Sequence, residues 1–328
     1  MEPSYKKFHY GLRPAKNIER KMMCEAFRRL ANFAKLEDYR YIGFGSIYFI
    51  DYCLLHRELG IGDMYSMEKR SDDEARVLFN KPFKCINIEI GNSNQVLGRI
   101  LESGKKTILW LDYDYELCDS IIYDVETFIS KAVSGCVLAV TIDAETDRLK
   151  EPKSEIDEGS DWPKKPVEQL KRLVNPNYLP HDISPENLRG DTLHKTYRWI
   201  LNSRIHYSLM NRNSTKDSEN TMNYKQIMHF IYSDGVKMQT IIWVFYTNNE
   251  KEKYQKCNFE GMEYFRSNES FFQIKTPILT IKEMAELDKK MPCETEVITE
   301  KPDWISEEEY RDYCNLYRWY PRFTEVDY

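Results

Sequence analysis

The sequence lacks any apolar run long enough to cross a membrane, and it does not begin with a secretory signal pattern. The longest apolar stretch lies near residues 241–245, far short of the roughly 18 residues that a membrane helix needs. Residues 1–10 are polar and charged, which is not typical of a signal peptide. We therefore expect a cytoplasmic protein without a membrane partner.

Closely spaced cysteine pairs are also missing. None of the eight cysteines belongs to a C-x-x-C pair, so the ligand spacing typical of zinc sites is absent. The cysteines lie inside periodic or strand-like segments, which suits small buried hydrophobic residues in a reducing compartment. The sequence also has no H-x-x-x-H pair, Walker loop or G-x-S-x-G motif, so these catalytic patterns are not candidates.

The composition is that of a globular protein with a small excess of acid. Lys and Arg number 47 and Asp and Glu number 53, which gives a formal net charge of −6. Hydrophobic residues make up 41% and aromatic residues 13%, which is enough for a sizeable core and argues against disorder. The negative balance argues against a protein that coats nucleic acid by bulk charge. A length of 328 residues suits one large domain or two modest ones.

Strand-like and helical segments alternate between residues 39 and 145. Five apolar runs separated by helical patterns predict a parallel, doubly wound α/β sheet that is buried on both faces. Two later runs, 225–232 and 238–246, flank an Asp-Gly turn and predict an antiparallel pair. The fold class is therefore a Rossmann-like, mostly parallel sheet with an antiparallel last strand. The predicted strands are 39–45, 63–67, 85–90, 107–111 and 136–142, and the helices between them are 48–59, 72–79, 95–101 and 118–133.

Other segments flank or interrupt this core. A proline-rich insertion is expected to be irregular over 150–190 and helical over 191–210. The C-terminal part is acidic and rich in aromatic residues, so we expect it to dock on the core. The predicted divisions are a basic N-terminal helical arm at 1–38, the Rossmann-like core at 39–149, the insertion at 150–222, the last two core strands at 223–250 and the C-terminal extension at 251–328.

Basic side chains recur along one side of the predicted N-terminal helix. Pro14 suits the first turn of a helix, and Arg13, Lys16 and Arg20 follow i, i+3, i+7 spacing. One interpretation is a docked helix with a solvated basic face. The other is a lid or anion-binding arm, whose partner is a phosphate of the substrate or the acidic tail around residues 307–309.

Glycine and polar residues follow the first two predicted strands. In an open parallel sheet, ligands bind beyond the carboxyl ends of the strands. Gly43, Gly45 and Ser46 follow the first strand, where glycines let the backbone approach a ligand and amides lie near a helix N-terminus. Glu68 ends the second strand and offers a carboxylate to ribose hydroxyls. These residues are our candidates for cofactor binding.

The third and fourth strands end in further candidates. Gly91 and Asn92 end the third strand, where they are placed to reach an adenine ring. Asp112 and Asp114 end the fourth strand near the expected reacting centre, where a carboxylate can deprotonate or orient a hydroxyl group. The alternative interpretation of both acids is that they cap the next helix.

Together these motifs resemble the class I S-adenosylmethionine-dependent methyltransferases. Residues 12–16 and 110–114 add similarity to a bacterial group related to O-methyltransferases. The resemblance implies S-adenosylmethionine as cofactor, with its methionine part in the loop and its ribose on Glu68. It also implies methyl transfer to an oxygen or nitrogen acceptor. The segments that carry the resemblance are Ile42-Gly43-Phe44-Gly45-Ser46, Glu68, Ile90-Gly91-Asn92 and Leu111-Asp112-Tyr113-Asp114.

The same resemblance raises the question of a metal. Some O-methyltransferases of this superfamily hold a divalent metal between acids after the fourth and fifth strands, which here are Asp112 and Asp143. The Asp-Asn pair expected after the fifth strand is Asp143-Ala144 in this chain. We therefore expect no metal, with Asp112 and Asp143 as the weak candidates.

Two functions stay open. In the first, Asp112 positions or deprotonates the acceptor, which the insertion 150–222 binds. In the second, a non-catalytic methyltransferase-like module binds a partner protein or nucleic acid through the basic helix and the insertion, for example in an anti-phage defence system. Tyr41 stands where the family carries an acid and favours the second, whereas Glu68 and Gly91-Asn92 favour the first.

Overall fold

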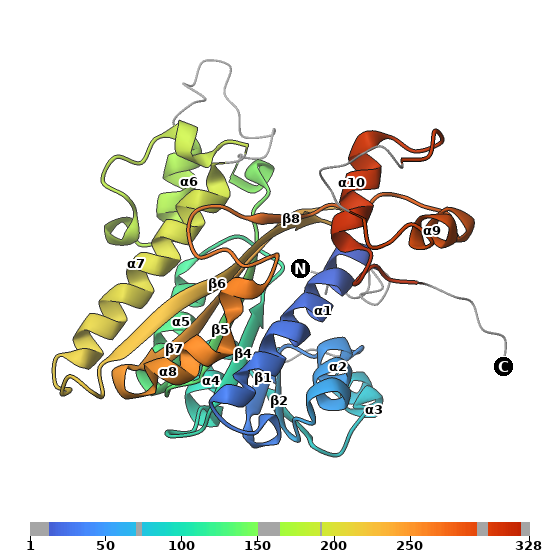
Figure 1. The fold of residues 1–328 in the computed structure, drawn as a ribbon. Helices are drawn as coiled ribbons and strands as arrows, with labels where there is room; N and C mark the ends of the chain where they lie inside the picture. The colour runs from blue at the N-terminus through green and yellow to red at the C-terminus, as the bar shows by residue number, and fades with distance from the viewer. Residues whose placement is uncertain (1–12, 70–73, 150–164, 191, 294–300, 323–328) are drawn as a thin grey trace.

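One eight-stranded sheet forms the centre of the molecule (Figure 1). The computed structural model describes residues 13–69, 74–149, 165–190, 192–293 and 301–322. The strand order is β3-β2-β1-β4-β5-β7-β6-β8. The strands are β1 Arg40–Gly43, β2 Asp63–Glu68, β3 Ile86–Ile90, β4 Thr107–Asp112, β5 Val137–Asp143, β6 Met222–Ser233, β7 Lys237–Thr247 and β8 Phe272–Ile274.

The sheet is mostly parallel, as the sequence predicts. Strands β1 to β5 pair in parallel, so their carboxyl ends share one edge. Among the described strands, only β7 runs against its neighbours, β5 and β6. The central strand β5 is buried at every residue, which explains its continuous apolar sequence. The α/β fold class is confirmed.

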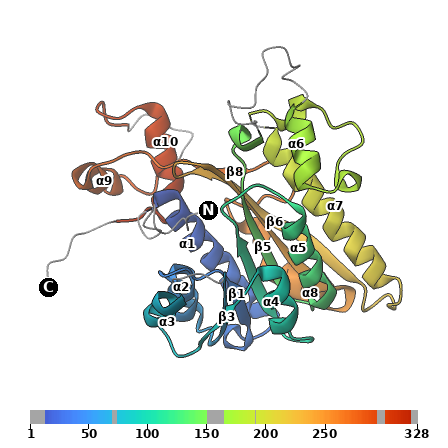
Figure 2. The same ribbon diagram turned by 180° about the vertical axis from the view of Figure 1, so that it is seen from behind.

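Two layers of helices cover the sheet, and Figures 1 and 2 show them from opposite sides. The α-helices of the described residues are α1 Pro14–Arg28, α2 Ile50–Leu59, α3 Glu74–Asn80, α4 Ser93–Ile100, α5 Asp119–Lys131, α6 Lys165–Leu173, α7 Leu193–Asn213, α8 Lys251–Cys257, α9 Ile281–Asp288 and α10 Glu307–Leu316. None of these helices is both long and apolar enough to cross a membrane.

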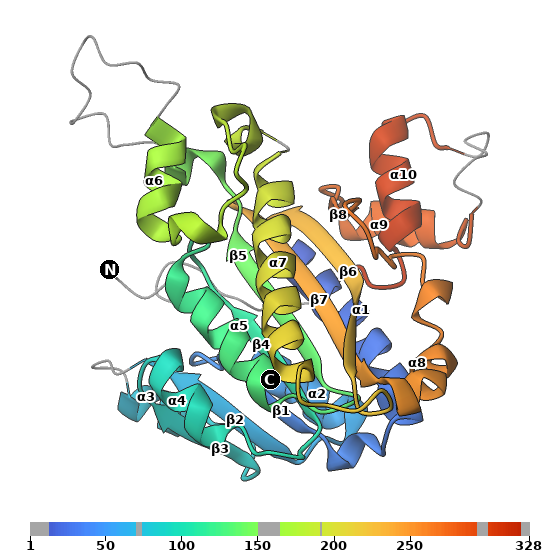
Figure 3. The same cartoon turned by 90° about the vertical axis from the view of Figure 1, so that its left-hand side faces the viewer.

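Each layer packs against one face of the sheet. Residues of α1, α2 and α8 share a hydrophobic cluster with Tyr41 and Trp110. Residues of α4, α5 and α7 share the other large cluster with Leu109 and Leu111, and Figure 3 shows α5 and α7 side by side on that face. Successive residues of β4 therefore face different layers, because side chains alternate along a strand.

Several elements were not predicted from the sequence, and α6 and β8 are two of them. The expectation of irregular structure over 150–190 is wrong for α6, whose Val167 and Leu170 pack into the second cluster; residues 150–164 lie outside the described part. The prolines around α6 hide its helical spacing. Strand β8 is only three residues long and pairs in parallel with β6, so it gives no periodic signal.

The cysteines also differ from expectation. Cys24, Cys136 and Cys257 are buried and free, in keeping with small hydrophobic residues. Cys293 and Cys314 instead form a disulfide, with 6.3 Å between their Cα atoms. The expectation of small buried hydrophobic residues in a reducing compartment is therefore wrong for this pair. The two are 21 residues apart in sequence, and their contact depends on how α10 folds back.

The C-terminal extension contacts the N-terminal helix. Lys21 Nζ on α1 donates a hydrogen bond to the Trp319 carbonyl at 3.0 Å, and Trp319 Nε1 donates to Glu25 Oε2 at 2.9 Å. Trp319 is 5% exposed and belongs to the cluster that α1 forms with the sheet. Residues 13–28, near the start of the chain, are thus fixed partly by residues near its end.

Candidate functional site

The loop after β1 needs glycine at two positions. A Cβ atom on Gly43 would lie 2.7 Å from the Tyr41 hydroxyl, and a Cβ atom on Gly45 would lie 2.6 Å from Ser66 Oγ and from the Phe49 ring. Side chains cannot be accommodated at such distances, so both positions bring the backbone close to neighbouring strands. This explains the Gly-x-Gly spacing by packing within the chain.

The same loop contains two residues with left-handed backbone conformations. Ser46 has a φ of 54° and Phe49 a φ of 47°. Each costs a non-glycine residue on the order of 1 kcal/mol or more, so surrounding contacts must hold the loop in place. The Ser46 amide makes one such contact, to Glu68.

Glu68 joins the end of β2 to this loop through one of its two oxygens. Its Oε1 accepts hydrogen bonds from the Gly45 amide at 2.9 Å, the Ser46 amide at 3.0 Å and Ser66 Oγ at 2.6 Å. Burial raises the pKa of Glu68, and these three hydrogen bonds oppose that rise. Within the described residues, Oε2 accepts no hydrogen bond and can receive one from a ligand.

Gly91 and Asn92 lie beside Glu68. The Gly91 amide donates to the Glu68 carbonyl at 2.9 Å, so the end of β3 is tied to the end of β2. Gly91 has a φ of 150°, a conformation that favours glycine. Asn92 is exposed and precedes α4, and its side chain makes no capping hydrogen bond. All six predicted cofactor residues therefore lie along one edge of the sheet, at the carboxyl ends of β1, β2 and β3.

Asp112 belongs to a buried cluster of charges, which we call the Lys16 cluster: Lys16, Glu19, Asp112 and Tyr232. Lys16 Nζ lies 2.7 Å from Asp112 Oδ1, 2.8 Å from Glu19 Oε2 and 3.0 Å from the Tyr232 hydroxyl. It also lies 4.5 Å from the centre of the Trp110 ring. Of these contacts, those to Asp112 and Tyr232 are hydrogen bonds, and the contact to Glu19 is an ion pair.

The charges of the Lys16 cluster influence each other's protonation. Burial alone would lower the pKa of Lys16, but the Asp112 and Glu19 carboxylates outweigh it and raise that pKa. Burial raises the pKa of Glu19, and Lys16 opposes this rise. Lys16 is therefore held in its charged form and is not a candidate base. The Asp112 side chain is 23% exposed, and its Oδ2 accepts no hydrogen bond from the described residues.

Helix α1 is anchored at several further points. Arg20 Nε lies 2.5 Å from Asp51 Oδ1 on α2, and both side chains are buried. Asp234, in the turn between β6 and β7, accepts hydrogen bonds from the Ala15 and Lys16 amides at 3.2 and 3.0 Å. The helix is therefore docked, but the expected solvated basic face is wrong at Lys16 and Arg20, which are 4% and 5% exposed.

The predicted basic stripe thus meets carboxylates of the core. Arg13 immediately precedes α1 and is half-buried. Within the described residues of the acidic tail, Glu308 pairs with Lys275. Binding of a substrate anion by Arg13, Lys16 and Arg20 stays a prediction.

The two other predicted acids lie apart from the Lys16 cluster. Asp114 is exposed, whereas Asp143 is 1% exposed and its Oδ1 accepts the Glu145 amide at 2.7 Å. Helix α5 has Cys118 as its N-cap residue, so Asp112 and Asp114 do not cap it. Across the described part of the chain, no group of three or more His, Cys, Asp or Glu residues could hold a metal ion.

Sequence reasoning missed Ser66, Glu19, Asp51 and Asp234 as partners of the site. The i, i+3 spacing of Lys16 and Glu19 could have indicated their pairing. Ser66 precedes Glu68 by two residues, so the two share a face of β2, which was also a usable signal. Nothing in the sequence pattern indicates Asp51 or Asp234, because their contacts depend on the docking of α1.

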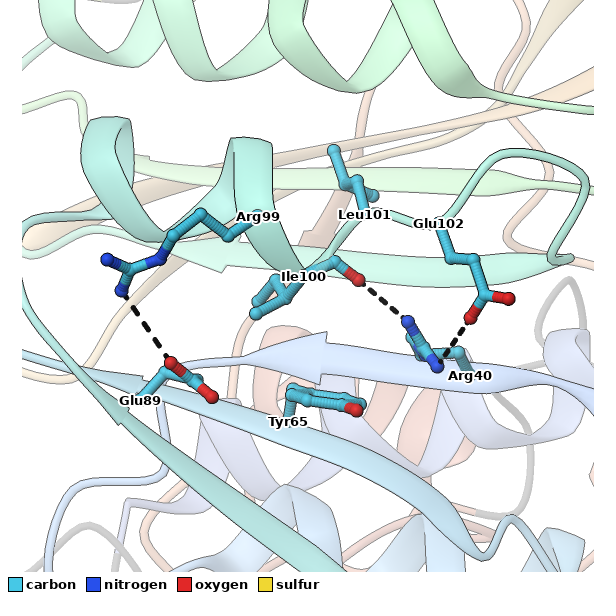
Figure 4. A pocket seen from close by; sticks show the side chains of 7 residues that line it. All are labelled: Arg40, Tyr65, Glu89, Arg99, Ile100, Leu101 and Glu102. Atoms are coloured by element: carbon cyan, nitrogen blue, oxygen red, sulfur yellow. Dashed lines mark hydrogen bonds and ion pairs between the residues drawn. The ribbon is translucent and has the colours of Figure 1, made fainter.

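A surface pocket lies away from these residues (Figure 4). Its charges are already paired: Arg40 contacts Glu102 at 3.1 Å, and Arg99 contacts Glu89 at 3.6 Å. No predicted site residue lines it. The lining residues are Arg40, Tyr65, Glu89, Arg99, Ile100, Leu101 and Glu102.

Solved structures are similar to this chain at low identity. A "putative S-adenosylmethionine dependent methyltransferase" from Listeria monocytogenes is 9% identical, with a TM-score of 0.40 over 67% of this chain and 97% of its own. The O-methyltransferase TomG from Streptomyces achromogenes is 12% identical, with a TM-score of 0.32 over 67% and 78%. A mutant form of MtNAS is 7% identical, with a TM-score of 0.32. The similarity covers 69% of this chain and 60% of that one.

A match at the level of the family is far more extensive. None of the curated proteins matches the chain. Residues 8–328 match the family described as "Putative O-methyltransferase". Because this match covers almost the whole chain, the protein belongs to this family.

Proposed function

We propose that this protein transfers a methyl group from S-adenosylmethionine to an oxygen or nitrogen atom of an acceptor. Family membership supports the reaction class. When bound, S-adenosylmethionine supplies a methyl group on a positively charged sulfur atom. The protein then has to bind, orient and, where required, deprotonate the acceptor.

The observation that carries the proposal is the arrangement of Glu68. Its Oε1 is fully used by the glycine loop and Ser66, whereas its Oε2 accepts no hydrogen bond from the described residues. A half-buried carboxylate with one unused oxygen at the end of β2 suits the two adjacent hydroxyls of a ribose. Gly91 and Asn92 follow directly beside it, and we propose that they contact the adenine.

Asp112 is our candidate for acting on the acceptor. It ends β4, the neighbour of β1, and therefore lies beside the glycine loop. Lys16 holds its Oδ1, and its Oδ2 remains able to accept a hydrogen bond or a proton from an acceptor hydroxyl or amine. Asp114 follows it on an exposed turn and is the weaker candidate.

We place the acceptor on the side of the insertion, residues 150–222. This segment follows β5, whose carboxyl end lies at the same edge as Asp112. Its described helices α6 and α7 pack with α5 over that half of the sheet. Recognition of a partner protein or nucleic acid through this segment is the alternative proposal.

Calorimetry with S-adenosylmethionine tests the cofactor. We expect saturable binding, and Glu68→Ala should weaken it by about 1.5–3 kcal/mol, the range for hydrogen bonds to a charged group. Glu89→Ala is a matched control, because Glu89 is a half-buried acid on neighbouring β3 that pairs with Arg99. If the wild-type protein gives neither heat nor a thermal shift at high cofactor concentration, the cofactor proposal fails and the non-catalytic module is favoured.

A further inference from the structure

Ser66 lies between the glycine loop and Glu68. It is completely buried on β2. Its hydroxyl donates to Glu68 Oε1 at 2.6 Å and accepts from the Gly45 amide at 2.9 Å. One hydroxyl therefore contacts both the loop and the acid that ends the strand.

The position of this hydroxyl limits how the Glu68 carboxylate can turn. The amides of Gly45 and Ser46 approach Oε1 from the loop, and Ser66 approaches the same oxygen from within β2. Donors from two directions hold Oε1 in one place, so the direction of Oε2 is set as well. Without the hydroxyl, only the loop amides would hold the carboxylate, and its plane could tilt away from the direction that the second oxygen now has.

We propose that Ser66 is a positioning residue that assigns different partners to the two Glu68 oxygens, Oε1 to the glycine loop and Oε2 to the ribose hydroxyls of the cofactor. The inference rests on the proposed function, in which Glu68 binds the ribose. It adds that ribose recognition depends on a buried residue that does not touch the cofactor.

A purely structural role for Ser66 makes a different prediction. A hydroxyl that only stabilises the loop would affect every ligand of the site equally. A hydroxyl that aims Oε2 affects ligands according to whether they carry the ribose hydroxyl. S-adenosylhomocysteine and its 2′-deoxy counterpart differ in that group alone, so the ratio of their affinities separates the two roles.

The test is calorimetry of both ligands with four proteins. The wild type should prefer S-adenosylhomocysteine by about tenfold or more, the worth of a hydrogen bond to a carboxylate. Ser66→Ala should reduce this preference by about threefold or more, because a mis-aimed acceptor bonds weakly. Glu68→Gln should remove most of it, and Ser66→Ala/Glu68→Gln should lose no more than Glu68→Gln alone.

The matched control is Ser134→Ala. Ser134 is another buried serine, 8% exposed, and it lies just before the amino end of β5. Its hydroxyl accepts a hydrogen bond from the Thr247 amide. This variant should keep the preference within about twofold, as expected for a distant independent site. If Ser66→Ala does not fold, Ser66→Cys retains a weak donor and should show an intermediate preference.

The outcomes are distinct. Equal weakening of both ligands by Ser66→Ala, or an unchanged preference, overturns the positioning role while leaving the cofactor proposal intact. A wild type that binds both ligands equally overturns the ribose role of Glu68 and the inference with it. A wild type that binds neither S-adenosylmethionine nor S-adenosylhomocysteine overturns the proposed function itself.

Discussion

The two halves of the candidate site are built in different ways. The half around the glycine loop uses neutral donors and one carboxylate, and its Gly45–Glu68 contact joins residues 23 positions apart. The Lys16 cluster uses an ammonium group between two carboxylates, and its Lys16–Tyr232 contact joins residues 216 positions apart. The first half is therefore visible as motifs at the ends of neighbouring strands, whereas the second exists only after α1 has docked.

This difference predicts that chemistry and cofactor binding can be separated by mutation. Asp112→Asn should lower turnover by about 10²–10⁴, the usual worth of a positioned acid or base, while cofactor affinity changes little. The measurement is transfer of a labelled methyl group from S-adenosylmethionine, with acceptors screened among small hydroxyl and amine compounds. Asp38→Asn, at an exposed residue before the amino end of β1, serves as the control. Unchanged turnover in Asp112→Asn would remove Asp112 from the catalytic site.

Stability should respond most strongly in the Lys16 cluster. Lys16→Met leaves two carboxylates without their buried cation, and removal of one partner from a buried pair costs about 3–5 kcal/mol. Unfolding in urea, followed by circular dichroism, measures the change. Lys21→Met is the matched control on the same helix, because the one hydrogen bond of its ammonium group within the described residues goes to the Trp319 carbonyl.

A second variant sharpens the comparison. Lys16→Met/Glu19→Gln removes one of the two stranded carboxylates and should recover part of the lost stability. If Lys16→Met costs no more than Lys21→Met, the Lys16 cluster does not hold α1 in place.

Acid should destabilise the folded protein through His229, which lies on β6. Burial, followed by the nearby charges of His194 and Arg198, lowers the pKa of His229 to about 3. An unfolded histidine has a pKa of about 6.5, so the unfolded state takes up a proton first. The contribution of neutral His229 is therefore present above about pH 6.5 and is lost as the pH falls toward about 3.

The measurement is the free energy of unfolding as a function of pH for wild type and His229→Gln. The difference between the two proteins should shrink as the pH falls through this window. His206→Gln is the control, since His206 is exposed on α7. A difference that stays constant between pH 7 and pH 4 would contradict the assignment.

The smallest expected effect concerns the start of α1. Asp234 accepts two amide hydrogen bonds of its first turn, as an N-cap side chain would. Asp234→Ala should therefore cost about 1 kcal/mol of stability, and Ser233→Ala, at the exposed neighbouring residue, should cost little. Because this contact fixes the end of α1 that carries Lys16, a loss approaching that of Lys16→Met would show that the two anchors act together.

Most of the parallel core could be predicted because its signals are local. Five apolar runs alternate with helical patterns, and the observed elements match them to within a few residues. The glycine loop, Glu68 and Asp112 could be placed at one edge for the same reason, since parallel strands end on the same side. Strand β8 and helix α6 could not be predicted, because one is too short and the other is surrounded by prolines.

The sequence by itself determined the α/β class, the edge at which the candidate residues lie and the residues that end each strand. These follow from hydrophobic periodicity and chain order, which need no knowledge of distant contacts. The tertiary structure decided what Lys16 and Arg20 do. The sequence shows two cations on a helix, but their partners, Asp112 and Asp51, come from other elements. Burying those charges is favourable only once opposite charges lie within reach, and that condition is met only in the folded chain.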